Sequence, residues 1–173
     1  MPVISAVIVN YNAGKLLRAC VDSLLNCPLN LEIIVVDNAS KDGSLEALHG
    51  LPQVQIVKNL ENVGFATGCN IGARLATAPF MLFLNPDCSF LPGTLVQMVE
   101  AMGADPRIGM AGGFLVNSDG TEQAGGRRAV PTPWRSFVRA FGLVRLADRW
   151  PRLYWDFHLH KQPLPAQVSE VEA

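Results

Sequence analysis

Short apolar runs alternate along most of the chain with segments in which apolar residues recur at helical spacing. Four of these runs, rich in Val, Ile, Leu and Phe, predict strands at residues 5–9, 32–36, 53–58 and 80–84. The intervening segments predict helices at residues 14–26, in a short stretch ending at Gly50, at 64–76 and at 92–103. Strands separated by helices form βαβ units with right-handed crossovers. The sequence therefore predicts an α/β fold with a Rossmann-like, mainly parallel sheet flanked by helices.

The same pattern gives three finer expectations. Residues 80–84 are apolar at every position, which predicts a strand covered by helices on both faces. Residues 108–116 are expected to form a further strand, because the strong turn signal Asn-Ser-Asp-Gly follows at 117–120. Asn12 is the expected N-cap of the helix at residues 14–26.

Three of the apolar runs end in a cluster of polar side chains. The clusters are Asn10-Tyr11-Asn12, Asp37-Asn38 and Asn85-Pro86-Asp87. Open parallel sheets bind ligands beyond the carboxyl ends of their strands, at the point where the strand order switches. The sequence therefore predicts one shared polar site, in which Asp37 and Asp87 open into a common cleft.

Asp37 has two interpretations. Its carboxylate could accept a hydrogen bond from a nucleobase N–H or a ribose hydroxyl, as acidic strand-end residues do in dinucleotide-binding folds. Alternatively it is a turn residue that caps the next helix, a role that Asp42 fits better. We favour ligand contact, and the sequence leaves both interpretations open.

The two later polar segments are also ambiguous. Asn62-Val63-Gly64-Phe65, with Asn70 after it, enters a predicted helix, where Gly64 would permit close backbone approach and the helix N-terminus would favour phosphate. Taken alone, such a segment is common in turns. Asn85-Pro86-Asp87 could supply hard oxygen ligands to Mg²⁺ or Mn²⁺, or could be a β-turn that closes a strand.

Composition limits the classes of protein. At 173 residues, with 49% hydrophobic and 17% charged residues, the chain can form one domain with a sizeable core. No apolar run reaches the ~18–20 residues of a membrane span, and the N-terminus does not resemble a signal peptide. Four scattered cysteines favour reduced thiols in the cytoplasm over a zinc cage or a disulfide framework.

Several catalytic and phosphate-binding motifs are absent from the sequence. There is no Gly-x-x-x-x-Gly-Lys-Ser/Thr loop, which excludes a P-loop ATPase. Residues 10–14 stand where a dinucleotide-binding enzyme would carry Gly-x-Gly-x-x-Gly, and there is no Gly-x-Ser-x-Gly elbow. A nucleotidyltransferase is also disfavoured, because a basic, glycine-rich loop after the first strand is missing.

Taken together, the motifs resemble glycosyltransferase family 2, the inverting enzymes with a GT-A nucleotide-sugar-binding fold. The resemblance rests on VIVNYN, VVDNASKDGS, NVGFATGCNIGA and MLFLNPDC in this order. The later LPGTL, GGFLVNSDGT and GRR segments are similar to the rhamnosyltransferase-like subgroup. The resemblance covers roughly residues 3–145 and is far more specific than any single motif.

The resemblance implies a role for each matching residue. The donor, a nucleoside-diphosphate sugar carrying UDP, dTDP or GDP, would be bound by Asn10, Tyr11, Asp37, Asn62, Gly64, Asn70 and Asn85. Asp87 would be the ligand of a divalent metal, Mg or Mn. Asn85 replaces the first acidic residue of the common Asp-x-Asp motif, which should weaken intrinsic metal affinity and leave more of the binding to the diphosphate.

The family's general base is an acidic residue in a later segment, and no convincing candidate follows Val116. The acidic residues there lie in turn-like or tail contexts: Asp119, Glu122, Asp148, Asp156, Glu170 and Glu172. We therefore expect a chain truncated after the nucleotide-sugar-binding half, with a donor site but no acceptor site.

Charge divides the chain near residue 126. Residues 1–126 carry 6 Lys+Arg and 11 Asp+Glu, whereas residues 127–173 carry 8 and 4 and hold all three tryptophans. We expect an α/β nucleotide-sugar-binding domain at 1–126 and, at 127–173, a basic, aromatic-rich tail that begins an incomplete acceptor-side region.

The tail has two interpretations of its own. Apolar residues fall at helical spacing with arginines between them: Trp134, Phe137, Val138, Phe141 and Val144. A basic amphipathic helix can lie on an anionic membrane, which would place the protein in the cytoplasm, peripheral at the inner face of the membrane. The alternative, which we favour, is that the aromatic residues pack on the sheet or on an absent second half. Uncovered aromatic residues are also compatible with a homo-oligomer.

The sequence thus predicts a glycosyltransferase that moves a sugar from a nucleoside diphosphate to the hydroxyl of a sugar or lipid-linked acceptor. Transfer would proceed with inversion, in cell-surface polysaccharide or glycan synthesis, and no nucleic-acid partner is expected. The alternative is a non-catalytic subunit for nucleotide-sugar binding or assembly. Because the general base is missing, we expect the isolated chain to bind donor but to transfer sugar poorly or not at all.

Overall fold

A computed structural model describes residues 1–117, 119–123, 126–127, 132–147, 149–150 and 153–154. The chain divides into two compact units, one over Met1–Ala111 and one from Gly112 onward, and each is described by itself. The boundary predicted at residues 126/127 lies within the second unit and stays a prediction.

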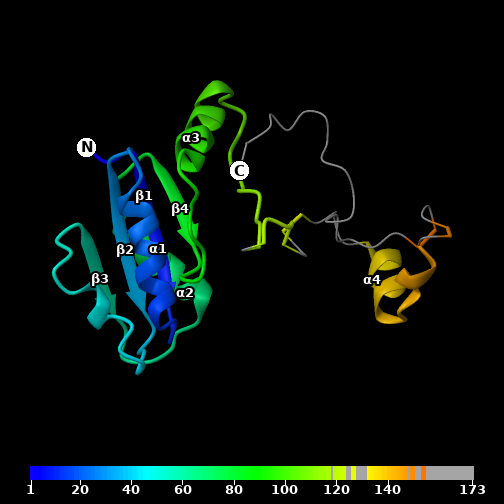
Figure 1. The fold of residues 1–173 in the computed structure, drawn as a ribbon, viewed down its shortest axis with the longest axis horizontal. Coiled ribbons are helices and arrows are strands. Elements are labelled where there is room, and N and C mark those ends of the chain that lie inside the picture. Colours follow the sequence, from blue (N-terminus) through cyan, green and yellow to red (C-terminus); the bar gives the residue numbers. More distant parts are fainter. Residues whose placement is uncertain (118, 124–125, 128–131, 148, 151–152, 155–173) are drawn as a thin grey trace. The chain divides into compact units, whose positions relative to one another are not determined.

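The first unit is built on a four-stranded sheet. Its strands are β1 (Ile4–Asn10), β2 (Leu31–Asp37), β3 (Val54–Lys58) and β4 (Phe80–Leu84), in the order β3-β2-β1-β4 (Figure 1). All three strand pairs are parallel. The predicted α/β fold and its four main strands are confirmed, because each of the four apolar runs forms one strand of the sheet.

Helices cover the sheet on opposite faces (Figure 1). The helices of the first unit are α1 (Lys15–Leu25), the 3₁₀ turn η1 (Glu46–Leu48), α2 (Phe65–Ala73) and α3 (Thr94–Ala104). Residues of α1, η1 and α3 pack with Ile4, Ala6 and Ile8 of β1, whereas α2 packs on the alternate side chains of β1 and β2. The expected short helix before Gly50 is therefore a single 3₁₀ turn.

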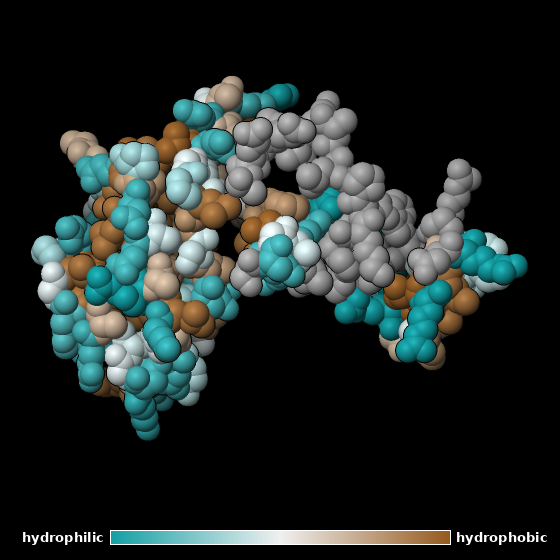
Figure 2. All heavy atoms as spheres, in the orientation of Figure 1, coloured by the Kyte–Doolittle hydropathy of each residue, from teal (hydrophilic) through white to brown (hydrophobic). Residues whose placement is uncertain are grey.

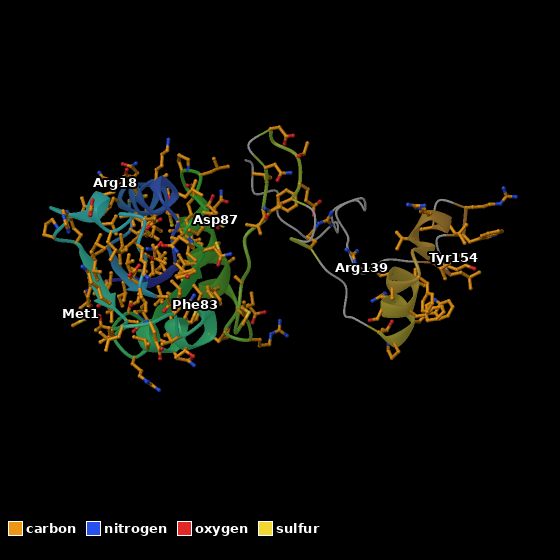
Figure 3. All side chains as sticks on the ribbon, turned by 90° about the horizontal axis from the view of Figure 1, so that it is seen from below. Met1, Arg18, Phe83, Asp87, Arg139 and Tyr154 are labelled. Atoms are coloured by element: carbon orange, nitrogen blue, oxygen red, sulfur yellow. The ribbon has the colours of Figure 1, made fainter. Side chains whose placement is uncertain are left out.

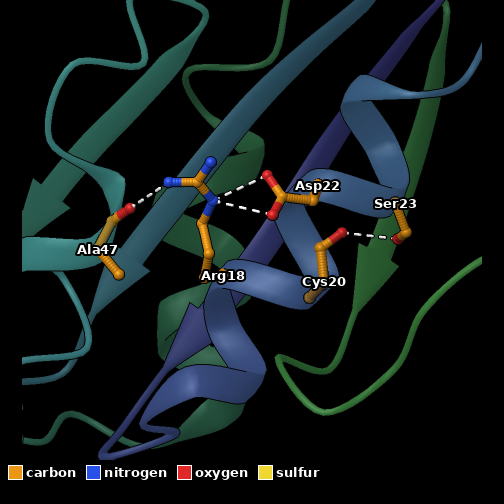
Figure 4. Close-up of polar contacts among 5 residues, drawn as sticks. All are labelled: Arg18, Cys20, Asp22, Ser23 and Ala47. Carbon is orange, nitrogen blue, oxygen red and sulfur yellow. Dashed lines mark hydrogen bonds and ion pairs between the residues drawn. The ribbon is translucent and has the colours of Figure 1, made fainter.

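The turn η1 is fixed to α1 by one arginine (Figure 4). Arg18 Nε donates to both carboxylate oxygens of Asp22, one turn further along the helix, at 2.8 and 2.9 Å. Its Nη1 donates to the Ala47 carbonyl at 2.8 Å. The connection between β2 and β3 is thus held against α1, next to the buried Leu48.

One prediction about β4 is wrong. Met81 and Phe83 remain 45% and 49% exposed, so helices do not cover both faces of this strand in the described part of the chain. The other face, with Phe80, Leu82 and Leu84, packs into the main core. The cause is position: β4 is the last strand of the sheet beside β1, and α2 lies over β1 and β2.

The strand predicted at residues 108–116 is also wrong. Only an isolated antiparallel bridge between Val116 and Glu122 forms there. Gly109, Gly112 and Gly113 interrupt the apolar residues and offer no side chains to pack, which weakens a strand. The turn signal itself is confirmed, because Gly120 N donates to the Asn117 carbonyl at 2.9 Å.

The second unit contains a short amphipathic helix. Its elements are α4 (Pro133–Ala140) and the 3₁₀ turn η2 (Leu143–Leu146). Thr132 caps α4 by accepting from Arg135 N, and Pro133 occupies its first turn, as is favourable at helix starts. The helical spacing predicted for this segment is confirmed. Among the described residues no helix is long and apolar enough to cross a membrane.

Candidate functional site

The three polar clusters lie at one edge of the sheet. Asn10 and Asp37 are the last residues of β1 and β2 and are register partners, and the Asn85–Asp87 segment follows β4. Because the strands are parallel, these carboxyl ends lie at the same edge of the sheet. The chain passes from β1 to β2 on one side, whereas β4 lies on the other side of β1, so this edge holds a switch in strand order. The clusters thus share one edge of the sheet, and Asp87 is labelled in Figure 3. Asp37, however, is only 3% exposed, so its carboxylate does not open with Asp87 into the predicted common cleft.

Asn10 lies at the centre of a buried hydrogen-bond network. Its Nδ2 is 2.7 Å from Asp37 Oδ1, 3.0 Å from Ser40 Oγ and 2.8 Å from Ser44 Oγ. The side chain has no exposed surface, and its Oδ1 is buried without a partner. Asn10 therefore supports the loop after β2, and direct contact with a donor would require that loop to move.

Asp37 is almost as buried as Asn10. It is 3% exposed; Oδ1 accepts from Asn10, and Oδ2 accepts from Ser40 N at 3.0 Å. Both oxygens therefore already shape the turn. Contact between Asp37 and a nucleobase or ribose stays a prediction.

Asp42 joins two strand-end loops. Its Oδ1 accepts from Ser44 N at 3.0 Å. Its Oδ2 accepts from the backbone N–H of Gly14, in the loop after β1, at 2.6 Å. Hydrogen bonds from Ser44, and then from Gly14, lower the pKa of this carboxyl. Asp42 is thus a turn residue, as predicted, but the prediction that it caps the next helix is wrong, because η1 has no side-chain cap.

The prediction that Asn12 caps the first helix is wrong. The N-cap is Gly14, with φ 56°, and no side chain caps α1. Asn12 instead accepts from Lys41 N at 2.8 Å, while its own backbone N–H donates to Ser40 Oγ at 3.0 Å. These two hydrogen bonds join the loop after β1 to the loop after β2. Tyr11, which precedes Asn12 in the loop after β1, is 53% exposed.

A second network, of asparagines, was not predicted. Asn38 is 2% exposed; its Oδ1 accepts from Asn59 at 2.8 Å, and its Nδ2 lies 3.2 Å from Asn62 Oδ1 and 3.3 Å from the Gly64 carbonyl. Asn62 Oδ1 also accepts from Gly64 N. One feature of the sequence points to this network: Asn38 and Asn59 directly follow the last residues of β2 and β3.

These amides place the entrance to α2. Gly64 is its N-cap at φ 84°, a conformation that other residues rarely adopt. A Cβ there would have no atom within 4 Å, so glycine is needed for its conformation rather than for lack of space. Asn62, Gly64 and Asn70 are all exposed, as donor-binding residues should be.

Asn85-Pro86-Asp87 is both a turn and an open site. Cys88 N donates to the Asn85 carbonyl at 3.2 Å, which closes the turn. Asp87 is exposed, and among the described residues its carboxylate accepts a weak hydrogen bond from Cys88 Sγ at 3.7 Å. The two interpretations of this segment are therefore compatible.

Cys20 lies beside this turn in the core. Its Sγ is 3.7 Å from the Asn85 carbonyl. Burial, followed by the proximity of Cys88 and Asp87, raises the pKa of the Cys20 thiol to about 12. Cys20 is thus a neutral core residue.

The exposed oxygens of this turn fit a divalent metal only in part. Asp87 offers a carboxylate and Asn85 an amide oxygen, both hard ligands suited to Mg²⁺ or Mn²⁺. Among the described residues, no group of three or more His, Cys, Asp or Glu side chains could hold an ion by itself. Such a site would depend on phosphate oxygens of the donor for its remaining ligands.

The candidates for a general base divide into two groups. Asp119 accepts from Thr121 N and Oγ1, which lowers the pKa of its carboxyl, and Glu122 forms an ion pair with Arg127 at 2.7 Å. Both are therefore committed to local structure. Four further acidic residues lie outside the described residues: Asp148, Asp156, Glu170 and Glu172.

Comparison with solved structures defines the class. The fold is similar to that of the mannosyltransferase PcManGT from Pyrobaculum calidifontis in complex with GDP-Man and Mn²⁺. The TM-score is 0.58 at 27% identity, over 62% of this chain and 34% of that one. This is the GT-A glycosyltransferase fold. The sequence model of Glycosyl transferase family 2 matches residues 5–161, and the chain belongs to this family.

Curated relatives agree with this assignment. A protein of Haemophilus influenzae described as an uncharacterized glycosyltransferase is 30% identical over 107 residues, 61% of this chain and 36% of the relative. The N-acetylglucosaminyl-diphospho-decaprenol L-rhamnosyltransferase of Mycobacterium tuberculosis is 26% identical over 166 residues, 88% of this chain and 52% of the relative. The chain thus spans about a third to a half of the length of these relatives.

Proposed function

We propose that this chain is the donor-binding half of an inverting glycosyltransferase that uses a nucleoside-diphosphate sugar. The observation that carries the proposal is the exposed Asp87 carboxylate at the strand-order switch, on the same edge as the loops after β1 and β2. A carboxylate left open at this place is suited to a ligand, because it is not committed to holding the turn that presents it.

The donor would be bound by exposed groups of the loop after β1, of the segment that enters α2 and of α2 itself. Tyr11 offers an aromatic ring, and Asn62 and Asn70 offer amides. Gly64 and the N-terminus of α2 offer backbone N–H groups to phosphate oxygens. In this proposal Asn10, Asp37 and Asn38 hold these groups in position through their hydrogen bonds.

Asp87, with the Asn85 amide oxygen, would hold Mg²⁺ or Mn²⁺ together with the donor. A metal bound there would act as a Lewis acid that stabilises the negative charge of the departing diphosphate. The presence of Mn²⁺ and GDP-Man in a structural relative supports this assignment. The donor nucleotide could be UDP, dTDP or GDP.

The acceptor side of the proposal rests on the relatives. One relative is named for transfer of rhamnose to an N-acetylglucosaminyl-diphospho-decaprenol, a lipid-linked sugar. We infer an acceptor of this chemical class and a role in cell-surface polysaccharide or glycan synthesis. A general base must take the proton of the acceptor hydroxyl.

A second candidate function follows from the general-base residues. Asp119 and Glu122 are both engaged in local contacts. A chain that binds donor without transferring sugar would be a nucleotide-sugar-binding or assembly subunit. Measuring donor binding and sugar transfer separately distinguishes the two functions.

Titration calorimetry tests the donor site. The whole chain is titrated with UDP-, dTDP- and GDP-sugars, with and without Mn²⁺. One of these donors should bind in a metal-dependent manner, and Asp87→Ala should lower its affinity in Mn²⁺ at least about tenfold, a usual effect of losing a group that supports a metal.

Asp105→Ala is the matched control. Asp105 is a half-buried carboxylate that follows α3 and pairs with Arg107 at 2.7 Å. This variant should bind donor as the unaltered chain does. Unchanged donor affinity in Asp87→Ala would remove the metal-site assignment.

A further inference from the structure

The second unit exposes a row of aromatic rings. Trp134 and Phe137 are stacked on α4 with centroids 5.5 Å apart, and Phe137 and Phe141 are 4.4 Å apart. These three side chains remain 51%, 43% and 67% exposed, whereas Val138 on the same helix is fully buried. The helix thus uses a small apolar residue for packing and leaves its largest ones uncovered.

Further apolar side chains are exposed close by in the sequence. Trp150 is 47% and Leu153 56% exposed. Trp134 Nε1 donates to the Leu153 carbonyl at 2.7 Å, which brings the two ends of this segment together. Hydrophobic and hydrophilic residues adjoin on the surface of this unit in Figure 2. We call the set Trp134, Phe137, Phe141, Trp150 and Leu153 the aromatic patch.

Positive charge predominates in the sequence around the aromatic patch. Residues 132–154 carry one acidic residue, Asp148, and five arginines, at positions 135, 139, 145, 149 and 152. Of these, Arg149 lies over the Trp150 ring, 5.4 Å from its centroid. A partner that covers the aromatic patch must therefore accept apolar side chains and supply negative charge.

An anionic bilayer meets both requirements. Tryptophan and other aromatic side chains are favoured at membrane interfaces, where an apolar body meets a polar edge. Arginine heads interact there with lipid phosphates while their stems remain in apolar surroundings. A helix of eight residues, from Pro133 to Ala140, is suited to lie in the interface rather than to cross it.

We propose that the aromatic patch binds the surface of an anionic membrane. The inference rests on the proposed function and extends it, because a lipid-linked acceptor would be presented at such a surface. Binding to lipid itself requires neither donor nor metal. Its failure can therefore be distinguished from failure of the donor site.

Vesicle co-sedimentation tests the proposal. The whole chain is mixed with phosphatidylcholine vesicles that contain or lack phosphatidylglycerol, without donor or metal. We expect binding only to the anionic vesicles, weakening as salt is raised, with a blue shift of tryptophan fluorescence. Arg145→Gln should weaken binding about fivefold, the usual contribution of one basic residue near such a surface.

Phe141→Ser tests the apolar part of the aromatic patch. Because Phe141 is 67% exposed, its replacement should leave the fold intact by circular dichroism and weaken vesicle binding about tenfold. Met110→Ser is the control: Met110 is 88% exposed in the first unit and should not affect binding.

Three results would overturn the proposal. One is equal binding to neutral and anionic vesicles, and another is vesicle binding that Phe141→Ser leaves unchanged. The third is absence of binding to the anionic vesicles. If the chain then also forms a dimer in size-exclusion chromatography that Phe141→Ser dissociates, the aromatic patch is an interface between two copies of the chain.

Discussion

At the residue scale, the candidate site depends on the buried Asn10 amide. Its two N–H groups serve three oxygen atoms, those of Asp37, Ser40 and Ser44, all within 3.0 Å. These contacts fix the loop after β2, and Ser40 in turn binds the backbone of Asn12. A residue with no exposed surface thus determines where the neighbouring Tyr11 presents its ring.

Replacing Asn10 by alanine should therefore destabilise the first unit. The Asp37 carboxylate would stay buried with one of its two donors lost, at a cost of about 2–3 kcal/mol in the free energy of unfolding. Urea denaturation measures this change. Asn70→Ala, which removes an exposed amide, should alter stability by less than about 0.5 kcal/mol. Equal effects of the two substitutions would contradict the role given to Asn10.

The sequence predicts where the polar clusters lie, but not which of their side chains reach the surface. Strand-end residues alternate in direction, and the next loop decides whether a polar side chain meets solvent or another loop. Asn10 and Asp37 therefore prove to be buried, whereas Tyr11 and Asp87 are exposed. The role of Asn38 could not be predicted from its own cluster, because its partners come from the segment between β3 and α2.

At the scale of elements, the site depends on the close approach of α2 to the sheet. Gly68 and Gly72 face β1, and a Cβ at Gly72 would lie 2.3 Å from Val7 Cγ1. No other residue fits at this distance without a shift of the helix. Such a shift would displace Gly64, where α2 begins beside the candidate site.

Gly72→Ala should thus destabilise the first unit by about 1–3 kcal/mol through overpacking. Gly103→Ala is the control, and its expected effect on stability is the opposite one. A Cβ at Gly103 in α3 has no atom within 4 Å, and the substitution should stabilise by about 0.5–1 kcal/mol. Thermal unfolding of the two variants measures both effects. A stabilised Gly72→Ala variant would contradict the packing described for α2.

Elements with continuous apolar runs could be predicted from the sequence, and those interrupted by glycine could not. The four main strands lie within one residue of their predicted ends, because apolar side chains recur through each of these runs. Residues 108–116 have a similar composition, but their three glycines remove the side chains that a strand would pack. The exposed Phe83 shows a further limit: an apolar run does not reveal that a strand lies at the edge of a sheet.

At the scale of the whole molecule, two units of different character share one chain. Residues 1–111 hold the sheet and the candidate donor site, and the second unit holds the basic helix α4 with its exposed rings. The chain spans about a third to a half of the length of these curated relatives. The account therefore assigns donor binding to the first unit and leaves sugar transfer as a proposal for the longer protein.

The most direct test of this account is a map of backbone amide chemical shifts during titration with Mg²⁺ and the donor identified by calorimetry. We expect the changes to concentrate at the carboxyl ends of the strands, at Tyr11, Asn12, Gly64, Asp87 and Cys88. Residues at the amino ends, such as Val3, Asn30 and Thr77, should remain unchanged. Changes concentrated at those amino-end residues, with Tyr11 and Asp87 unaffected, would contradict the central claim.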